Sequence, residues 1–122
     1  MANFEGVTSS SPGKIREEKM EELVGILEDH NIYPRPEISG DALYIHGYET
    51  LAIYDKEDDE DVTFEALEAI GNCLDGIMVI QCIGNEKCRF PLGAVEYAVS
   101  KDGVICNTFK DEYKPEDFKG TK

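Results

Sequence analysis

The chain has 122 residues, with 26 acidic and 12 basic side chains and a formal net charge of −14. This length supports a single domain with one core, and no apolar run approaches the roughly 20 residues that span a bilayer. The acidic balance argues against direct contact with nucleic acid or an anionic membrane, because both require clustered Lys and Arg. The N-terminus lacks the basic and apolar profile of a signal peptide, so we expect a cytoplasmic protein.

The first third of the chain predicts a flexible N-terminal arm over residues 1–11 and then an amphipathic helix over residues 12–30. Ser11 followed by Pro12 is a typical helix start, with Ser as the N-cap and Pro at the first helical position. Asn31 and the prolines after it predict the end of the helix. Apolar side chains recur at helical spacing along one face of this segment: Met20, Leu23, Val24 and Leu27.

The middle third predicts a β-hairpin followed by a second helix. Residues 42–46 and 51–54 are rich in β-branched and aromatic side chains, and the turn at Gly47 between them predicts that the two strands pair. A helix is expected over residues 63–74, with Thr63 as its cap. Its buried stripe is expected to consist of Phe64, Leu67, Ile70 and Leu74.

The last third predicts a meander of strands. Residues 77–83 are strongly apolar and are predicted to form a central strand. Residues 94–99 and 104–109 are predicted to form a hairpin around a Lys-Asp-Gly turn. A polar C-terminal tail is expected over residues 110–122, with at most a short turn at residues 115–118.

These elements predict an α+β fold in the order α-β-β-α-β-β-β, with an antiparallel sheet of about five strands and two main helices. Residues 12–109 are expected to form the single domain, between the arm and the polar tail. The order of elements resembles that of profilin-like and roadblock-type adaptor domains, which are mostly binding scaffolds. The resemblance rests on the order of elements alone, and an analogy of fold does not by itself establish function.

The acidic run between the second predicted strand and the second predicted helix is the main candidate site. Residues 41–70 hold ten of the 26 acids and a single base, Lys56. Packing does not require seven consecutive charged residues, so we interpret them as a solvated loop, a partner site or a cation site. Carboxylates just before a helix also suit the positive end of its dipole. The candidate binding residues are Tyr54, Asp55, Glu57, Asp58, Asp59, Glu60 and Asp61.

A calcium loop of the EF-hand type does not fit the acidic run. Such a loop needs Gly at its sixth position and a carboxylate at its twelfth. A loop that starts at Glu57 has Val62 at the sixth position, and one that starts at Asp55 has Glu60 there. We therefore predict no metal site and no cofactor.

The cysteines offer a second candidate chemistry. No C-x-x-C pair is present, so a zinc or thioredoxin-type motif is not indicated. If a turn is centred on Asn85, Cys82 and Cys88 face each other across a hairpin and could form a redox pair. In a cytosolic protein, reduced thiols are the default state. The four cysteines are Cys73, Cys82, Cys88 and Cys106.

Cys88 has the surroundings of a reactive thiol. It stands between Lys87 and Arg89, and neighbouring positive charge favours the thiolate. A catalytic thiol also needs a base, for which the sequence offers only His30 and His46. His30 is expected at the end of the first helix, where a histidine usually contacts helix carbonyls instead.

We interpret the chain as a non-enzymatic protein-binding module, an adaptor or inhibitor, that engages a basic partner surface through the acidic run. A nucleic-acid-binding protein is one such partner, in which case the chain acts as a nucleic-acid mimic. Tyrosines beside the acidic run suit the recognition of a protein surface. Two alternatives remain open: a thiol-redox protein or cysteine-dependent enzyme centred on Cys88, and a structural or salt-adapted protein whose acidic surface only maintains solubility. The oligomeric state also remains open.

Overall fold

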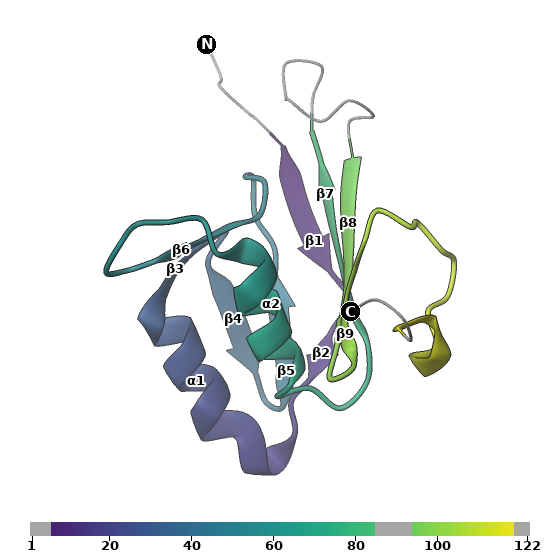
Figure 1. Ribbon diagram of the computed structural model, residues 1–122, viewed down its shortest axis with the longest axis horizontal. Coiled ribbons are helices and arrows are strands. Elements are labelled where there is room, and N and C mark those ends of the chain that lie inside the picture. The colour runs from purple at the N-terminus through teal and green to yellow at the C-terminus, as the bar shows by residue number, and fades with distance from the viewer. Residues whose placement is uncertain (1–5, 85–93, 119–122) are drawn as a thin grey trace.

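The computed structural model describes residues 6–84 and 94–118, which form helices and strands around a hydrophobic core (Figure 1). None of the helices in these residues is long and apolar enough to cross a bilayer. In chain order the elements are β1 (Val7–Ser10), β2 (Gly13–Lys14), the 3₁₀ helix η1 (Glu17–Lys19), α1 (Met20–Asp29), β3 (His30–Tyr33), β4 (Pro36–Ser39), β5 (Ala42–Ile45), β6 (Ala52–Asp55), α2 (Thr63–Gly71), β7 (Met78–Ile83), β8 (Ala94–Ser100), β9 (Gly103–Cys106) and the 3₁₀ helix η2 (Pro115–Phe118).

The strands are distributed over three antiparallel sheets, with the orders β1-β7-β8-β9, β2-β5-β4 and β3-β6. The predicted α+β class is confirmed, but the single sheet of about five strands and the predicted element order are wrong. The resemblance to profilin-like and roadblock-type domains was based on that order and does not extend to this arrangement. The two α-helices have ten and nine residues, and the smaller sheets contribute further core residues, Leu43 on β5 and Ile53 on β6 among them.

Helix α1 begins later than predicted. Ser11 does not cap a helix, because its Oγ accepts a hydrogen bond from the Val79 main-chain N–H at 2.9 Å. Gly13–Lys14 form β2 beside β5, and the Ile15 N–H donates to the Asp41 carbonyl at 2.7 Å. Neighbouring segments thus satisfy main-chain groups that the predicted helix would have satisfied internally.

The predicted hairpin between β5 and β6 is wrong, although both segments are strands. β5 pairs with β4, where Leu43 lies opposite Ile38, and β6 pairs with β3, where Ile53 lies opposite Ile32. β3 and β4 are not predicted, because the prolines around them indicate only the end of a helix. Their pairing with β5 and β6 places Leu43 and Ile53 in the core.

Several other elements are confirmed. β7 lies between β1 and β8 and is therefore central to its sheet, and β8 and β9 form the expected hairpin. Helix α2 begins at Thr63 as predicted and ends at Gly71. Three side chains of its predicted stripe are buried, but the fourth, Phe64, is 44 % exposed and does not belong to the core.

The first strand corrects the prediction of a flexible arm over residues 7–10. β1 pairs with β7, where Thr8 lies opposite Cys82. Thr8 and Gly47 also exchange main-chain hydrogen bonds of 2.9 and 3.0 Å. β1 therefore connects the four-stranded sheet to the chain just after β5, while residues 1–5 lie outside the described part.

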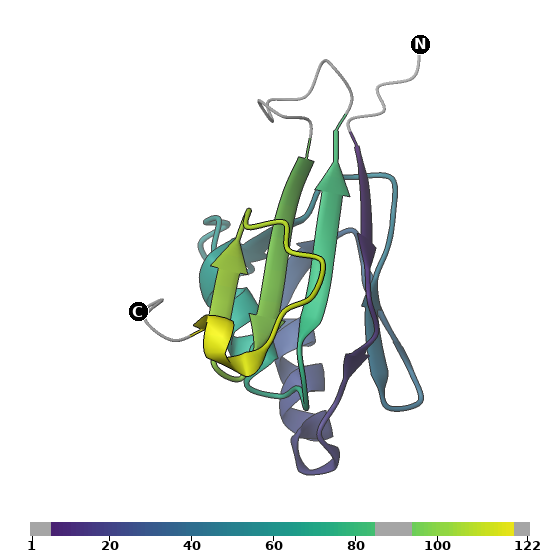
Figure 2. The same cartoon turned by 90° about the vertical axis from the view of Figure 1, so that its right-hand side faces the viewer.

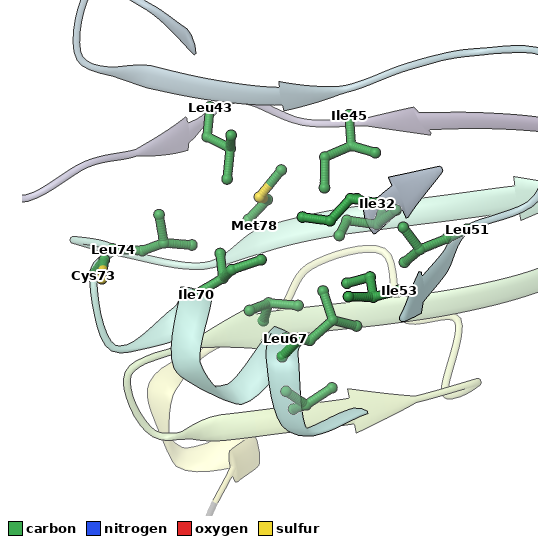
Figure 3. Close-up of a cluster of buried hydrophobic side chains, with 14 of the residues drawn as sticks. Ile32, Leu43, Ile45, Leu51, Ile53, Leu67, Ile70, Cys73, Leu74 and Met78 are labelled. Atoms are coloured by element: carbon green, nitrogen blue, oxygen red, sulfur yellow. The ribbon is translucent and has the colours of Figure 1, made fainter. Parts of the chain in front are cut away.

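A hydrophobic cluster fills the space between the sheets and α2 (Figure 3). Helix α2 packs on β8 and β9 and contacts β6, and α1 packs on β3 and α2. Burial of one large apolar side chain contributes about 1.5–3 kcal/mol, so this cluster is the main source of stability. The labelled members in Figure 3 are Ile32, Leu43, Ile45, Leu51, Ile53, Leu67, Ile70, Cys73, Leu74 and Met78.

The C-terminal strap, residues 107–118, lies on the face of the four-stranded sheet opposite α2 (Figures 1 and 2). The short turn predicted near its end is confirmed as η2, and Phe118 in this turn is 3 % exposed. The strap is therefore part of the folded structure, while residues 119–122 lie outside the described part. Three β8 side chains on this outer face are also buried: Glu96, Ala98 and Ser100.

Candidate functional site

The acidic loop, residues 55–61, is closed by its own main chain. The Asp55 N–H donates to the Glu60 carbonyl at 2.9 Å, and the Asp55 carbonyl accepts from the Asp59 N–H at 2.7 Å. Tyr54 and Asp61 then form an isolated antiparallel bridge. These bonds give the loop a defined conformation between β6 and α2, where the acidic run was predicted to lie.

Two of the predicted site carboxylates have structural roles. Asp55 Oδ1 accepts a hydrogen bond from the Glu57 N–H at 2.7 Å. Asp61 Oδ1 accepts from the Thr63 N–H at 3.0 Å and from the Thr63 hydroxyl at 2.7 Å. Thr63 does not cap α2 as predicted, because its Oγ1 accepts from the Ile53 N–H at 3.0 Å. Asp61 therefore provides the carboxylate at the positive end of α2.

We expect Asp61→Ala to lower the free energy of unfolding by about 0.5–2 kcal/mol. This is the usual cost of removing a side chain that accepts a hydrogen bond from a main-chain N–H at the start of a helix. Asp58→Ala should change it by less than about 0.5 kcal/mol, because the Asp58 side chain is exposed and has no such role. Urea unfolding followed by circular dichroism measures both changes. Equal effects of the two substitutions would contradict the structural role of Asp61.

The remaining carboxylates of the acidic loop form an exposed patch. In the part of the chain that the structure describes, the ion pairs join Arg16 to Glu18, Lys19 to Glu22 and Lys110 to Asp117, and none includes this loop. The charges of the patch are thus held close together on a defined main chain and remain directed to solvent. The patch consists of Glu57, Asp58, Asp59 and Glu60.

Aromatic side chains adjoin the acidic loop. Tyr54, which the sequence includes in the candidate site, is partly buried, and its ring centroid is 6.3 Å from that of Tyr33. Tyr33 is 46 % exposed, and Phe64 in the first turn of α2 is exposed to a similar extent. The loop therefore combines a charged tip with nearby apolar surface, and the exposure of Phe64 was not predicted.

The candidate redox pair is only partly within the described residues. Cys82 lies in the hydrophobic cluster, and its Sγ is 3.4 Å from the Thr8 hydroxyl oxygen. Its partner on β8 is Val95, so the predicted register that opposes Cys82 to Cys88 is wrong. Cys88 lies outside the described residues, and its reactivity stays a prediction.

Cys73 is buried in the core, whereas Cys106 is exposed at the end of β9. Desolvation raises the pKa of both thiols, which disfavours their reactive thiolate forms. Burial also raises the pKa of Tyr97 to about 12. His30 Nδ1 is 2.8 Å from the Ile26 carbonyl oxygen, which confirms its expected contact with the helix end.

Within residues 6–84 and 94–118, no group of three or more His, Cys, Asp or Glu side chains could hold a metal ion.

A polar cavity beneath the strap was not predicted. One of its lining residues, Glu96, occupies an outward position of an alternating strand, which by itself indicates exposure to solvent. The strap instead covers Glu96, and Tyr113 donates a hydrogen bond to its carboxylate. Burial and this hydrogen bond raise the pKa of Tyr113, while hydrogen bonds from Lys110 and Lys114 lower the pKa of Asp117. Aromatic residues in an otherwise polar tail were the only sequence signal for this arrangement.

Comparison of the chain with protein families, with curated proteins and with solved structures finds no match. Its function is therefore inferred from the geometry of these two places, the acidic loop and the cavity beneath the strap.

Proposed function

We propose that the chain is a non-enzymatic protein-binding module, an adaptor or inhibitor, whose acidic loop engages a basic surface of another protein. The observation that carries this proposal is the exposed patch of four consecutive carboxylates on a loop closed by its own main-chain hydrogen bonds. Such a patch attracts Lys and Arg side chains over a distance and speeds their encounter with the loop.

The defined conformation of the loop favours binding. Ordering a loop on association costs free energy, and a loop that is already ordered avoids most of this cost. Two hydrogen bonds close the loop at its base, and the Asp61 carboxylate joins its end to α2. A partner would therefore meet the carboxylates in the positions that they already occupy.

The aromatic side chains beside the loop add a second type of contact. Protein interfaces are enriched in aromatic residues near their centre and in charges around it. Tyr33, Tyr54 and Phe64 could cover the apolar parts of arginine or lysine side chains, or stack on guanidinium groups. The preferred partner is therefore a protein surface rich in arginine and lysine.

The proposal is tested with two variants that remove the same number of negative charges. The loop variant carries Glu57→Gln, Asp58→Asn, Asp59→Asn and Glu60→Gln. The control variant carries Glu21→Gln, Glu28→Gln, Asp29→Asn and Asp41→Asn, all at exposed positions on α1 or before β5. Proteins retained from an extract of the native host by each immobilised variant are identified, and the Kd of each purified candidate is measured.

We expect a partner that is retained by the wild type and the control variant and lost with the loop variant. An exposed ion pair contributes about 0.2–1 kcal/mol, so loss of four should weaken the Kd by roughly 4- to 1,000-fold. Raising the salt concentration from about 50 to 500 mM should weaken the wild-type complex strongly. A Kd that is insensitive to salt, or equal losses in both variants, would contradict binding through the acidic loop.

A nucleic-acid mimic is the special case in which the partner itself binds nucleic acid. The chain should then displace a short DNA or RNA duplex from the partner, and the loop variant should not. If both variants change solubility and salt tolerance but no partner binding, the acidic surface only maintains solubility.

A further inference from the structure

A polar row crosses the outer face of the four-stranded sheet and ends at Glu96, beneath the C-terminal strap. Ser9 on β1 lies opposite Gln81 on β7, which lies opposite Glu96 on β8. These side chains and several strap residues, Tyr113 among them, line a cavity of about 380 Å³. This volume lies in the range of small-molecule binding pockets.

Glu96 is a buried carboxylate whose hydrogen-bond partners are neutral. It is 2 % exposed, its Oε2 accepts from Gln81 Nε2 at 2.9 Å, and its Oε1 accepts from the Tyr113 hydroxyl. A buried carboxylate costs free energy unless a positive charge lies beside it. A carboxylate also accepts about four hydrogen bonds, so the two observed bonds leave acceptor capacity.

The other ionised side chains of the cavity do not compensate for this charge. Lys110 Nζ is 2.7 Å from Asp117 Oδ1, so its positive charge is already paired. Asp111 adds a second carboxylate to the lining. The lining therefore has an excess of negative charge, and it also includes the hydroxyl of Ser9.

We propose that this cavity binds a small molecule with a primary ammonium group, which contacts the carboxylates of Glu96 and Asp111. An ammonium group has three hydrogen-bond donors, and the carboxylates of Glu96 and Asp111 and the Ser9 hydroxyl in the lining are all acceptors. Hydrogen bonds between charged groups are stronger than those between neutral groups. The cavity shares no residue with the acidic loop, so this inference does not depend on the proposed function.

The test uses two probes of equal size, 5-amino-1-pentanol and 1,5-pentanediol, which differ in one charged group. Each is titrated into the ¹⁵N-labelled full-length protein, and the Kd is obtained from the shifts of the Gln81 side-chain amide and the Glu96 main-chain amide. We expect saturable shifts with the amine, contacts between its methylene protons and the Tyr113 ring by nuclear Overhauser effects, and no saturation with the diol.

Variants distinguish binding in the cavity from the general attraction of cations to an acidic protein. Glu96→Gln should weaken amine binding by about 10- to 100-fold, as the loss of one charged partner does. The new amide can still accept from Gln81 and donate to the Tyr113 oxygen, so the strap should stay in place. Asp111→Asn, at an exposed position, should weaken binding more mildly and provides a second test if the first variant unfolds.

The loop variant described above is the matched control and should bind the amine as tightly as the wild type. The proposal is overturned if the amine and the diol give the same response, or if neither gives saturable shifts. It is also overturned if loss of loop charge weakens binding as much as Glu96→Gln does. Failure here would leave the acidic-loop proposal untouched, because that proposal is measured with a protein partner.

Discussion

Gly71→Ala should lower the free energy of unfolding by about 1–3 kcal/mol, the usual cost of overpacking a close contact. Gly71 is the last residue of α2 and is buried against the end of β8. A Cβ atom there would lie against the Ser100 carbonyl oxygen and 2.9 Å from its carbonyl carbon. Both neighbours are main-chain atoms within a paired strand, so the helix or the sheet must shift to make room.

Gly25→Ala is the matched control, because Gly25 also lies in a helix but faces open space. A Cβ atom at this position would meet no atom within 4 Å. Alanine is the better helix former, so this substitution should raise the free energy of unfolding by about 0.4–1 kcal/mol. Urea unfolding measures both variants. A stabilising effect of Gly71→Ala would contradict the close packing of α2 on the sheet.

Ile53→Ala should destabilise the protein by about 2–5 kcal/mol, because it leaves a cavity in the core. Ile53 has no exposed surface and lies opposite Ile32 in the β3–β6 pair. Its main chain also accepts a hydrogen bond from the Val62 N–H and donates to Thr63 Oγ1. The substitution should therefore also speed hydrogen exchange of amides in the acidic loop, which can be followed by NMR.

Ile83→Ala provides the control for a residue of the same type. Ile83 is 56 % exposed at the end of β7, so its loss should change the free energy of unfolding by about 0.5 kcal/mol or less. Hydrogen exchange in the acidic loop should remain as in the wild type. Similar losses from the two substitutions would show that β6 does not contribute to the core in the manner described.

Helices and strands could be predicted where the spacing of apolar side chains and the turn residues identified them without information from distant segments. The central strand β7, the β8–β9 hairpin and the start of α2 follow from alternation, a short glycine turn and helical spacing. The acidic loop was also placed correctly between a strand and a helix. Phe64 shows the limit of helical spacing, because it fits the apolar stripe of α2 and yet remains exposed beside the loop.

Strand partners could not be predicted in the same way. The sequences of β5 and β6 both predict strands, and the turn between them predicts that they pair. Instead, β5 pairs with β4 and β6 pairs with β3. Alternation indicates which face of a strand is buried and carries no information about which strand lies beside it. Ser11 and Pro12 likewise have the features of a helix start, while hydrogen bonds to β7 hold Ser11 in an extended segment.

The amino-acid sequence by itself determined the α+β class, most of the strands, both α-helices in part, and the position of the acidic loop. These properties depend on side-chain periodicity and turn chemistry within a few neighbouring residues. Only the tertiary structure decided which strands pair, and that the strap covers Glu96 to form a cavity. The reason is physical: these contacts join segments whose proximity depends on how the faces of the whole chain pack around one core.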